Sequence, residues 1–268
     1  MSYEQSPEAP ESPAGGEPPA VEPPASALTD SAFGRLAGVL FSPAATFASI
    51  RRRPTWLVAF LVMTLLAAAA QMVAVGKLDT SEVRDQVELA LEKQGRTMSD
   101  EDLDDAVDLQ MKFGTGCGLV FVPIGLLLVA VVFMVVLRMS GSELTFVQSL
   151  STVVHAEMPL AVSALLAIPV LLGRTTPLGV TEAQNGILAS NLSILAPEGA
   201  SLVMTTLLAS FDLFAIWVVA LLAIGFAVVA GVSRAKAATV TVVLWLVWIV
   251  FKVGLAGLGQ AFGGGAGG

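Results

Sequence analysis

The 268-residue chain has little of the charge that keeps soluble proteins in water, and few of the side chains that bind metals. Only 13% of its residues are charged, whereas 55% are hydrophobic, and the mean hydropathy is +0.79. One cysteine, Cys117, and one histidine, His155, exclude an intrachain disulfide and a Cys/His metal cluster. The excess of acidic over basic residues gives no sign of a nucleic-acid partner, and we expect no cofactor. The composition therefore predicts a membrane protein.

Residues 1–28 lack both the basic residues and the apolar core of a cleavable signal peptide. Instead they carry glutamates among many prolines, and such a segment cannot bury enough apolar surface to offset its ordering entropy. We predict that 1–28 is a disordered acidic tail, and that the first membrane helix acts as an uncleaved signal. Residues 258–268 are predicted to be a flexible, glycine-rich C-terminus.

Residues 29–55 contain two short helical patterns that lead into a basic cluster. Arg51, Arg52 and Arg53 follow the second pattern, and Trp56 comes shortly after them. Arginine and tryptophan side chains favour the headgroup region of a bilayer. We interpret the segment as interfacial helices anchored by these four residues; the alternative is a cap packed on the membrane bundle.

Five apolar runs then have the length of about 20 residues that crosses a bilayer as a helix. Between the first and second runs, the segment 77–113 shows two amphipathic helical patterns separated by Gly95, which predicts an extramembrane helical hairpin. The predicted fold class is therefore all-α: a polytopic membrane helical bundle with five transmembrane helices, in a domain covering 56–257. The expected spans are about 56–76, 117–137, 145–173, 203–231 and 237–257.

Basic residues are concentrated in the short connections and the triple-arginine flank on one side of these spans. The positive-inside rule has most weight in such short segments. We therefore predict a multi-pass protein of the cell membrane with a cytoplasmic N-terminus and an external C-terminus. High alanine and glycine usage is typical of a GC-rich bacterium, and the expected location is the bacterial inner membrane.

The stretch SFDLFAIWVVALLAIGF, residues 210–226, places one carboxylate, Asp212, inside an apolar run. An ionised group at the centre of a membrane helix costs about 2.5 to 3.5 kcal/mol. The short turn at 233–236 makes the fourth and fifth predicted spans antiparallel neighbours, with Asp212 and Lys252 about 30 and 24 Å from that turn. This spacing predicts an intramembrane ion pair between them. Two alternatives stay open: each side chain extends separately to an interface, or Asp212 serves proton or ion passage.

The third predicted span carries Gln148, Thr152 and His155 on one helix face. A polar face in lipid must point into the bundle or toward water. It is therefore either satisfied by neighbouring groups or lines a small cavity or a pH-sensing site. Pro159 and Pro169 are predicted to kink this helix, because proline removes a backbone hydrogen bond.

Two stretches carry a family resemblance: FGRLAGVLFSPAATFASIRRRPTWL, residues 33–57, and the 210–226 block. Together they resemble the bacterial branch of the Yip1 domain family, over about 33–257. The resemblance implies a five-helix integral membrane protein with a cytoplasmic N-terminus. Eukaryotic members bind prenylated small GTPases, and the eukaryotic branch carries tyrosine-bearing DLYGP and GY motifs. Because Tyr3 is the only tyrosine here, these motifs are absent and GTPase binding is not carried over.

The function predicted from these features is a non-enzymatic scaffold that binds lipids or other membrane proteins. Its expected partners are the lipid bilayer, other membrane proteins and further copies of the chain. The alternative is an ion or small-molecule transporter or channel that uses Asp212, Lys252 and the His155 face. A membrane enzyme is disfavoured, because no catalytic or metal-ligand set converges in the sequence. Whether a water-accessible cavity reaches Asp212 or His155 distinguishes these readings, because a scaffold would bury both residues in dry contacts.

Overall fold

The computed structural model describes residues 31–263, and the acidic tail predicted at 1–28 lies outside them. The described chain is helical, which confirms the all-α prediction. Its helices are α2 (Ala32–Phe41), α3 (Pro43–Arg52), α4 (Leu57–Val75), α5 (Thr80–Lys93), α6 (Asp100–Met139), α7 (Phe146–Ala156), α8 (Met158–Gly173), α9 (Val180–Asn185), the 3-10 helix η1 (Leu192–Leu195), α10 (Leu202–Ala209), α11 (Leu213–Val229) and α12 (Arg234–Gly263).

Four helical segments of the described chain are long and apolar enough to cross a membrane, so the expected five spans are not confirmed. They are Leu57–Val75, Val120–Met139, Phe146–Gly173 and Arg234–Gln260. The predicted span 203–231 is divided, because the chain leaves the helix between Ala209 and Leu213. The second part, α11, has 17 residues. At about 1.5 Å per residue it extends about 25 Å, less than the hydrocarbon core of about 30 Å.

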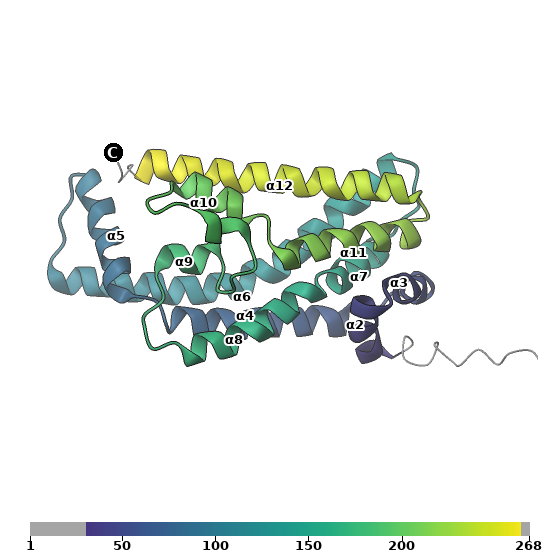
Figure 1. Ribbon diagram of the computed structural model, residues 1–268, viewed down its shortest axis with the longest axis horizontal. Coiled ribbons are helices and arrows are strands. Elements are labelled where there is room, and N and C mark those ends of the chain that lie inside the picture. Colours follow the sequence, from purple (N-terminus) through teal and green to yellow (C-terminus); the bar gives the residue numbers. More distant parts are fainter. Residues whose placement is uncertain (1–30, 264–268) are drawn as a thin grey trace, which may run out of the picture.

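The long helices run lengthwise through the molecule, with α2 and α3 at one end and α5 near the other (Figure 1). Helix α11 occupies one half of this length, and α9 and α10 occupy part of the other half. Gly231, with φ of 67°, lies in the tight turn between α11 and α12. Helix α12 continues to Gly263, so residues 258–263 are helical, and the flexibility predicted for 258–268 stays a prediction.

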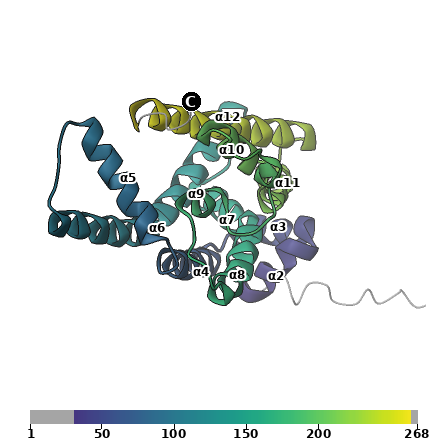
Figure 2. The same ribbon diagram turned by 60° about the vertical axis from the view of Figure 1, so that its left-hand side comes forward.

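The predicted extramembrane hairpin consists of α5 and the first part of α6, which stand apart from the rest of the bundle (Figure 2). Gly95 lies in the turn between them with φ of 65°. Ser99 caps α6, because its hydroxyl accepts from the N–H of Asp102 at 3.2 Å. The second arm of the hairpin continues without a break into the candidate span Val120–Met139, because α6 is one helix of 40 residues.

We expect Arg84→Met to loosen this hairpin. The Arg84 guanidinium pairs with Asp100 of α6 at 2.8 Å, with Asp104 of α6, and with Glu88 of its own helix at 3.3 Å. Hydrogen exchange should therefore become faster in α5, while exchange in the membrane helices stays unchanged. Lys112→Met is the matched control, since Lys112 pairs with Asp108 one turn away on the same helix. Equal effects of the two replacements would contradict a role for Arg84 in joining the arms.

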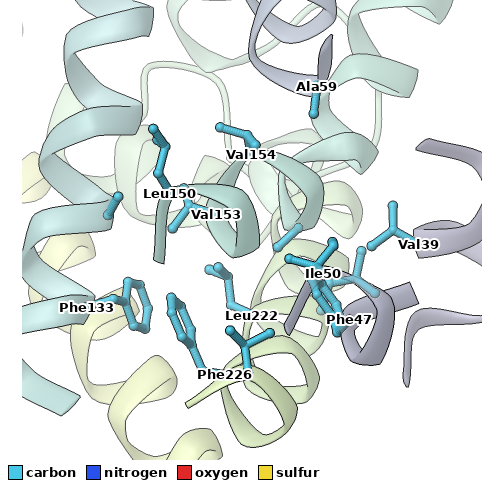
Figure 3. Close-up of a cluster of buried hydrophobic side chains, with 14 of the residues drawn as sticks. Val39, Phe47, Ile50, Ala59, Phe133, Leu150, Val153, Val154, Leu222 and Phe226 are labelled. Atoms are coloured by element: carbon cyan, nitrogen blue, oxygen red, sulfur yellow. The ribbon is translucent and has the colours of Figure 1, made fainter. Parts of the chain in front are cut away.

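The core lies where α3, α6, α7 and α11 meet (Figure 3). Phe47 and Ile50 of α3 are fully buried in it. The rings of Phe133 and Phe226 are stacked, with their centroids 4.4 Å apart. Burial of α3 supports the cap packed on the bundle rather than a helix lying only in the interface.

Hydrogen bonds also attach the N-terminal helices to the bundle. The buried Arg35 donates to the carbonyl of Arg53 at 2.8 Å and to the hydroxyl of Thr55 at 2.6 Å. Arg51 donates to the carbonyl of Val228, at the end of α11, at 3.2 Å. The headgroup contacts of Arg51, Arg52, Arg53 and Trp56 stay a prediction.

Candidate functional site

Asp212 is the N-cap of α11, at the break in the apolar run that the sequence presents as continuous. Its carboxylate accepts from the backbone N–H groups of Phe214 at 2.8 Å and Ala215 at 3.2 Å, and from the hydroxyl of Ser190. The N–H groups and dipole at a helix N-terminus stabilise a negative charge. The charge of Asp212 is therefore compensated by α11 itself and by Ser190.

A short segment after α9 supports this cap. The N–H of Leu213 donates to the carbonyl of Ser190 at 2.9 Å, and Asn191 pairs with Asp212 in an isolated antiparallel bridge. Asn191 is buried, and its side chain donates to the carbonyl of Asn185 at 2.9 Å and accepts from the N–H of Ser193 at 2.9 Å. These contacts fix the segment between α9 and η1 against the start of α11.

Helix α9 is itself attached to the start of α5 and to the end of α8. The carboxylate of Glu82 accepts from the N–H of Val180 at 3.0 Å, and Arg174 pairs with Glu182 of α9 at 3.0 Å. Leu78 and Leu178 form a parallel bridge next to these contacts. The connection from α8 to α10 is thereby anchored at both α9 and Asp212.

A cavity of about 660 Å³ opens beside this break. Its volume is in the range of small-molecule sites, about 300 to 1,000 Å³. Helices α8, α10 and α12, the start of α11 and the segment 183–191 form its walls. Most of the lining is apolar, and the charged members are Asp212 and Lys252.

Lys252 is partly buried on α12, and Leu255 and Ala256 follow it one turn later along the cavity wall. The structure thus brings Asp212 and Lys252 to one cavity, as residues of the predicted pair. Within the described part of the chain, however, no ion pair joins these two side chains. The direct pair stays a prediction.

The polar face of α7 lies outside this cavity, and two of its three predicted residues are buried. Thr152 and His155 are buried. The hydroxyl of Thr152 donates to the carbonyl of Gln148 at 2.8 Å, and Nδ1 of His155 lies 2.8 Å from the carbonyl oxygen of Ser151. Gln148 joins Thr145 in a capping box at the start of α7. Their hydrogen bonds therefore run to the backbone of their own helix.

The two prolines occupy different positions in the third predicted span. Helix α7 ends at Ala156 and α8 begins at Met158, so the helix is interrupted beside Pro159. Pro169 lies inside α8, which continues to Gly173. A bend of the helix axis at each proline stays a prediction.

We expect Asp212→Ala to lower the free energy of unfolding by about 1 to 2 kcal/mol, because it removes the cap of α11. Asp212→Asn should lower it less, since asparagine also accepts hydrogen bonds from the first turn. Thermal unfolding in detergent micelles measures both. If both replacements lowered the free energy of unfolding equally, the negative charge of Asp212, and not its hydrogen bonds as a cap, would be what stabilises the protein.

The sequence predicted both charged residues of the cavity, but it did not predict that the segment containing Ser190 and Asn191 forms part of the cavity wall. Ser190 and Asn191 lie about 20 residues before Asp212 in the chain, and no periodic pattern connects them to it. The available signal was local: the glycine and asparagine residues of 185–191 indicate a turn. A turn signal does not reveal which helix the turn contacts.

A family model described as the Yip1 domain matches residues 37–256, which is more than half of the chain. The matched region begins in α2, ends in α12 and includes every residue that lines the cavity. No curated protein and no solved structure matches the chain.

Proposed function

Because the chain belongs to the Yip1 domain family, we propose that it is a non-enzymatic membrane scaffold that holds an amphipathic ligand in the cavity beside Asp212. Family membership and the apolar helices make it an integral membrane protein. The observation that carries the finer proposal is the cavity itself, which reaches Asp212 and Lys252. The same cavity also supports transport, the second candidate below, because a scaffold without a ligand would bury Asp212 in dry contacts.

The composition of the cavity supports an amphipathic ligand. Leucine, isoleucine and alanine side chains form most of the wall, and polar side chains from α8, α9, α10, α12 and the segment before α11 also line it. A ligand with an apolar body and one polar end satisfies both parts. Lipids have this form and are present at high concentration around any membrane helix. Within residues 31–263 no group of three His, Cys, Asp or Glu side chains could hold a metal ion.

The proposal is tested by filling the cavity. Ala209→Trp places an indole in the cavity wall, whereas Ala90→Trp places one on the exposed surface of α5. Native mass spectrometry after extraction from lipid nanodiscs should show bound lipid on the wild type and on Ala90→Trp, and little on Ala209→Trp. Equal retention by all three proteins would contradict a ligand site at this cavity.

We also propose that the end of the molecule carrying α3 faces the cytoplasm. Within the described residues, the basic side chains at this end outnumber its one carboxylate, Glu143; they are Arg35, Arg51, Arg52, Arg53, Arg138, Arg234 and Lys236. This pattern follows the positive-inside rule for an inner-membrane protein.

Labelling of single cysteines tests this orientation in a Cys117→Ser background. A membrane-impermeant maleimide should label Ala90→Cys in intact cells, because α5 then lies outside. It should label Arg234→Cys, which begins α12 at the opposite end, only after the membrane is permeabilised. The reverse pattern would place the N-terminus outside the cell.

Transport is the second candidate, and the break between α10 and α11 favours it. Discontinuous helices that end at membrane depth form the ion and substrate sites of many secondary transporters. A transporter would give ion or proton flux in proteoliposomes that Asp212→Asn abolishes. Flux equal to that of protein-free liposomes would leave the scaffold as the function.

A further inference from the structure

Lys252 carries a positive charge that the described protein does not compensate. Its ammonium makes no hydrogen bond and no ion pair with any residue of 31–263, although it is partly buried in an apolar helix. A partly buried charged group is normally paired, because its transfer from water is costly. The partner of Lys252 is therefore to be sought in the cavity that it lines.

Asp212 does not form this ion pair in the structure. Its two carboxylate oxygens already accept from two backbone N–H groups and from the Ser190 hydroxyl. The N-terminus of α11 further compensates its negative charge. Of the two charges in the cavity, the positive one is thus the one left for a ligand.

Further polar groups line the same space. The side chains of Ser163, Gln184, Asn185 and Thr206 line the cavity, and none of them makes a hydrogen bond to another described residue. The two hydroxyls and two amides can each donate a hydrogen bond. With the ammonium they form a set of donors from α8, α9, α10 and α12. Such a set suits an anion with several acceptor oxygens.

The position of Lys252 along α12 also fits a lipid headgroup. Lys252 lies 18 residues after Arg234, the first residue of α12. At about 1.5 Å per residue this is about 27 Å, close to the full depth of the hydrocarbon core. The ammonium therefore lies near the boundary between acyl chains and headgroups, on the side of the membrane that carries α9.

We infer that the cavity binds an anionic phospholipid, with the phosphodiester group at Lys252 and the apolar part of the lipid along the leucine and alanine walls. This inference rests on the proposed function, and it adds the charge and the headgroup class of the ligand. A phosphodiester offers more acceptor oxygens than the carboxylate of a fatty acid, and so uses more of the donors that line the cavity.

The test compares lipid retention in nanodiscs made from equal parts of phosphatidylcholine and phosphatidylglycerol. Native mass spectrometry of the full chain identifies the lipid that stays bound to the wild type, Lys252→Met, Lys252→Arg and Lys236→Met. Lys236 is the control cation, because it lies at the opposite end of α12 and donates to the carbonyl of Ser140. Circular dichroism establishes that all four proteins are folded.

We expect the wild type, Lys252→Arg and Lys236→Met to retain phosphatidylglycerol in preference to phosphatidylcholine. Lys252→Met should lose this preference and retain about tenfold less phosphatidylglycerol, as expected for the loss of a hydrogen bond to a charged group. Equal retention of both lipids by the wild type, or undiminished phosphatidylglycerol on Lys252→Met, would overturn the inference.

Two further results separate this inference from the proposed function. If a neutral lipid is retained and Ala209→Trp removes it, the cavity is the ligand site but the anionic headgroup is wrong. If the wild type retains no lipid, both the proposed ligand site and the anionic headgroup are wrong. Oleate added to the same nanodiscs tests the headgroup class, since its displacement of phosphatidylglycerol would replace the phosphodiester by a carboxylate.

Discussion

Phe47→Ala is expected to lower the free energy of unfolding by about 3 to 5 kcal/mol, the cost of removing a large side chain from a closed core. Phe47 has no exposed surface, and it lies with Ile50, Leu222 and Phe226 where α3 meets α11 (Figure 3). Its truncation leaves a cavity between these helices that the bundle cannot easily close. Denaturant-induced unfolding in mixed micelles, followed by helix content, measures the loss.

Phe41→Ala is the matched control, since Phe41 ends the neighbouring helix α2 and is 82% exposed. Its replacement should change the free energy of unfolding by no more than about 0.5 kcal/mol. The comparison tests whether the N-terminal helices are part of the core. A small effect of Phe47→Ala would contradict the packing of α3 in the core and would support a helix lying in the membrane interface.

Gly225→Ala is expected to destabilise the protein by about 1 to 3 kcal/mol through overpacking. A Cβ atom at Gly225 would lie 2.7 Å from Cγ2 of Thr152 and 2.9 Å from the ring of Phe47. Both distances are far below a normal carbon contact of about 3.5 to 4.0 Å. The absence of a side chain at Gly225 therefore lets α3 and α7 approach α11 closely. Thermal unfolding in micelles measures the effect.

Gly254→Ala provides the control, because a Cβ atom there meets no other atom within 4 Å. In the middle of α12 this change should be neutral or should stabilise by up to about 1 kcal/mol, since alanine favours a helix more than glycine. Thr152→Ser, which removes Cγ2, should partly rescue Gly225→Ala. Equal effects of the two alanine replacements would contradict close packing at Gly225.

Hydropathy and periodicity were sufficient to predict the membrane class, the helical hairpin at 77–113 and four of the spans. They could not predict that the apolar run 203–231 is broken, because hydropathy records only the character of the residues along the chain. The break depends on contacts of Asp212 with Ser190 and Asn191, which the sequence separates from it. A carboxylate that the sequence places in a membrane helix is, in the structure, the cap at the start of one.

The N-terminal helices show a second limit of the same kind. An amphipathic helix that lies on a lipid surface and one that packs on a protein bundle have the same periodic pattern. Here the packing of α3 on the bundle depends on Gly225 of α11, which leaves room for the ring of Phe47. Gly225 lies far from α3 in the sequence, so the helical pattern of α3 does not reveal this contact. The cavity escaped prediction for a similar reason, because its walls come from segments that are not adjacent in the chain.

If the cavity beside Asp212 and Lys252 holds a lipid, that lipid must protect a cysteine placed in the cavity wall. In the Cys117→Ser background, Ala209→Cys lies in the cavity wall, Ala90→Cys on the exposed surface of α5, and Ala130→Cys in the closed core.

We predict that a maleimide labels Ala209→Cys in delipidated micelles and that added phosphatidylglycerol slows this reaction strongly. Ala90→Cys should react at the same rate with and without lipid, and Ala130→Cys should not react in either case. Labelling of Ala209→Cys that is unaffected by lipid would contradict a lipid site in this cavity.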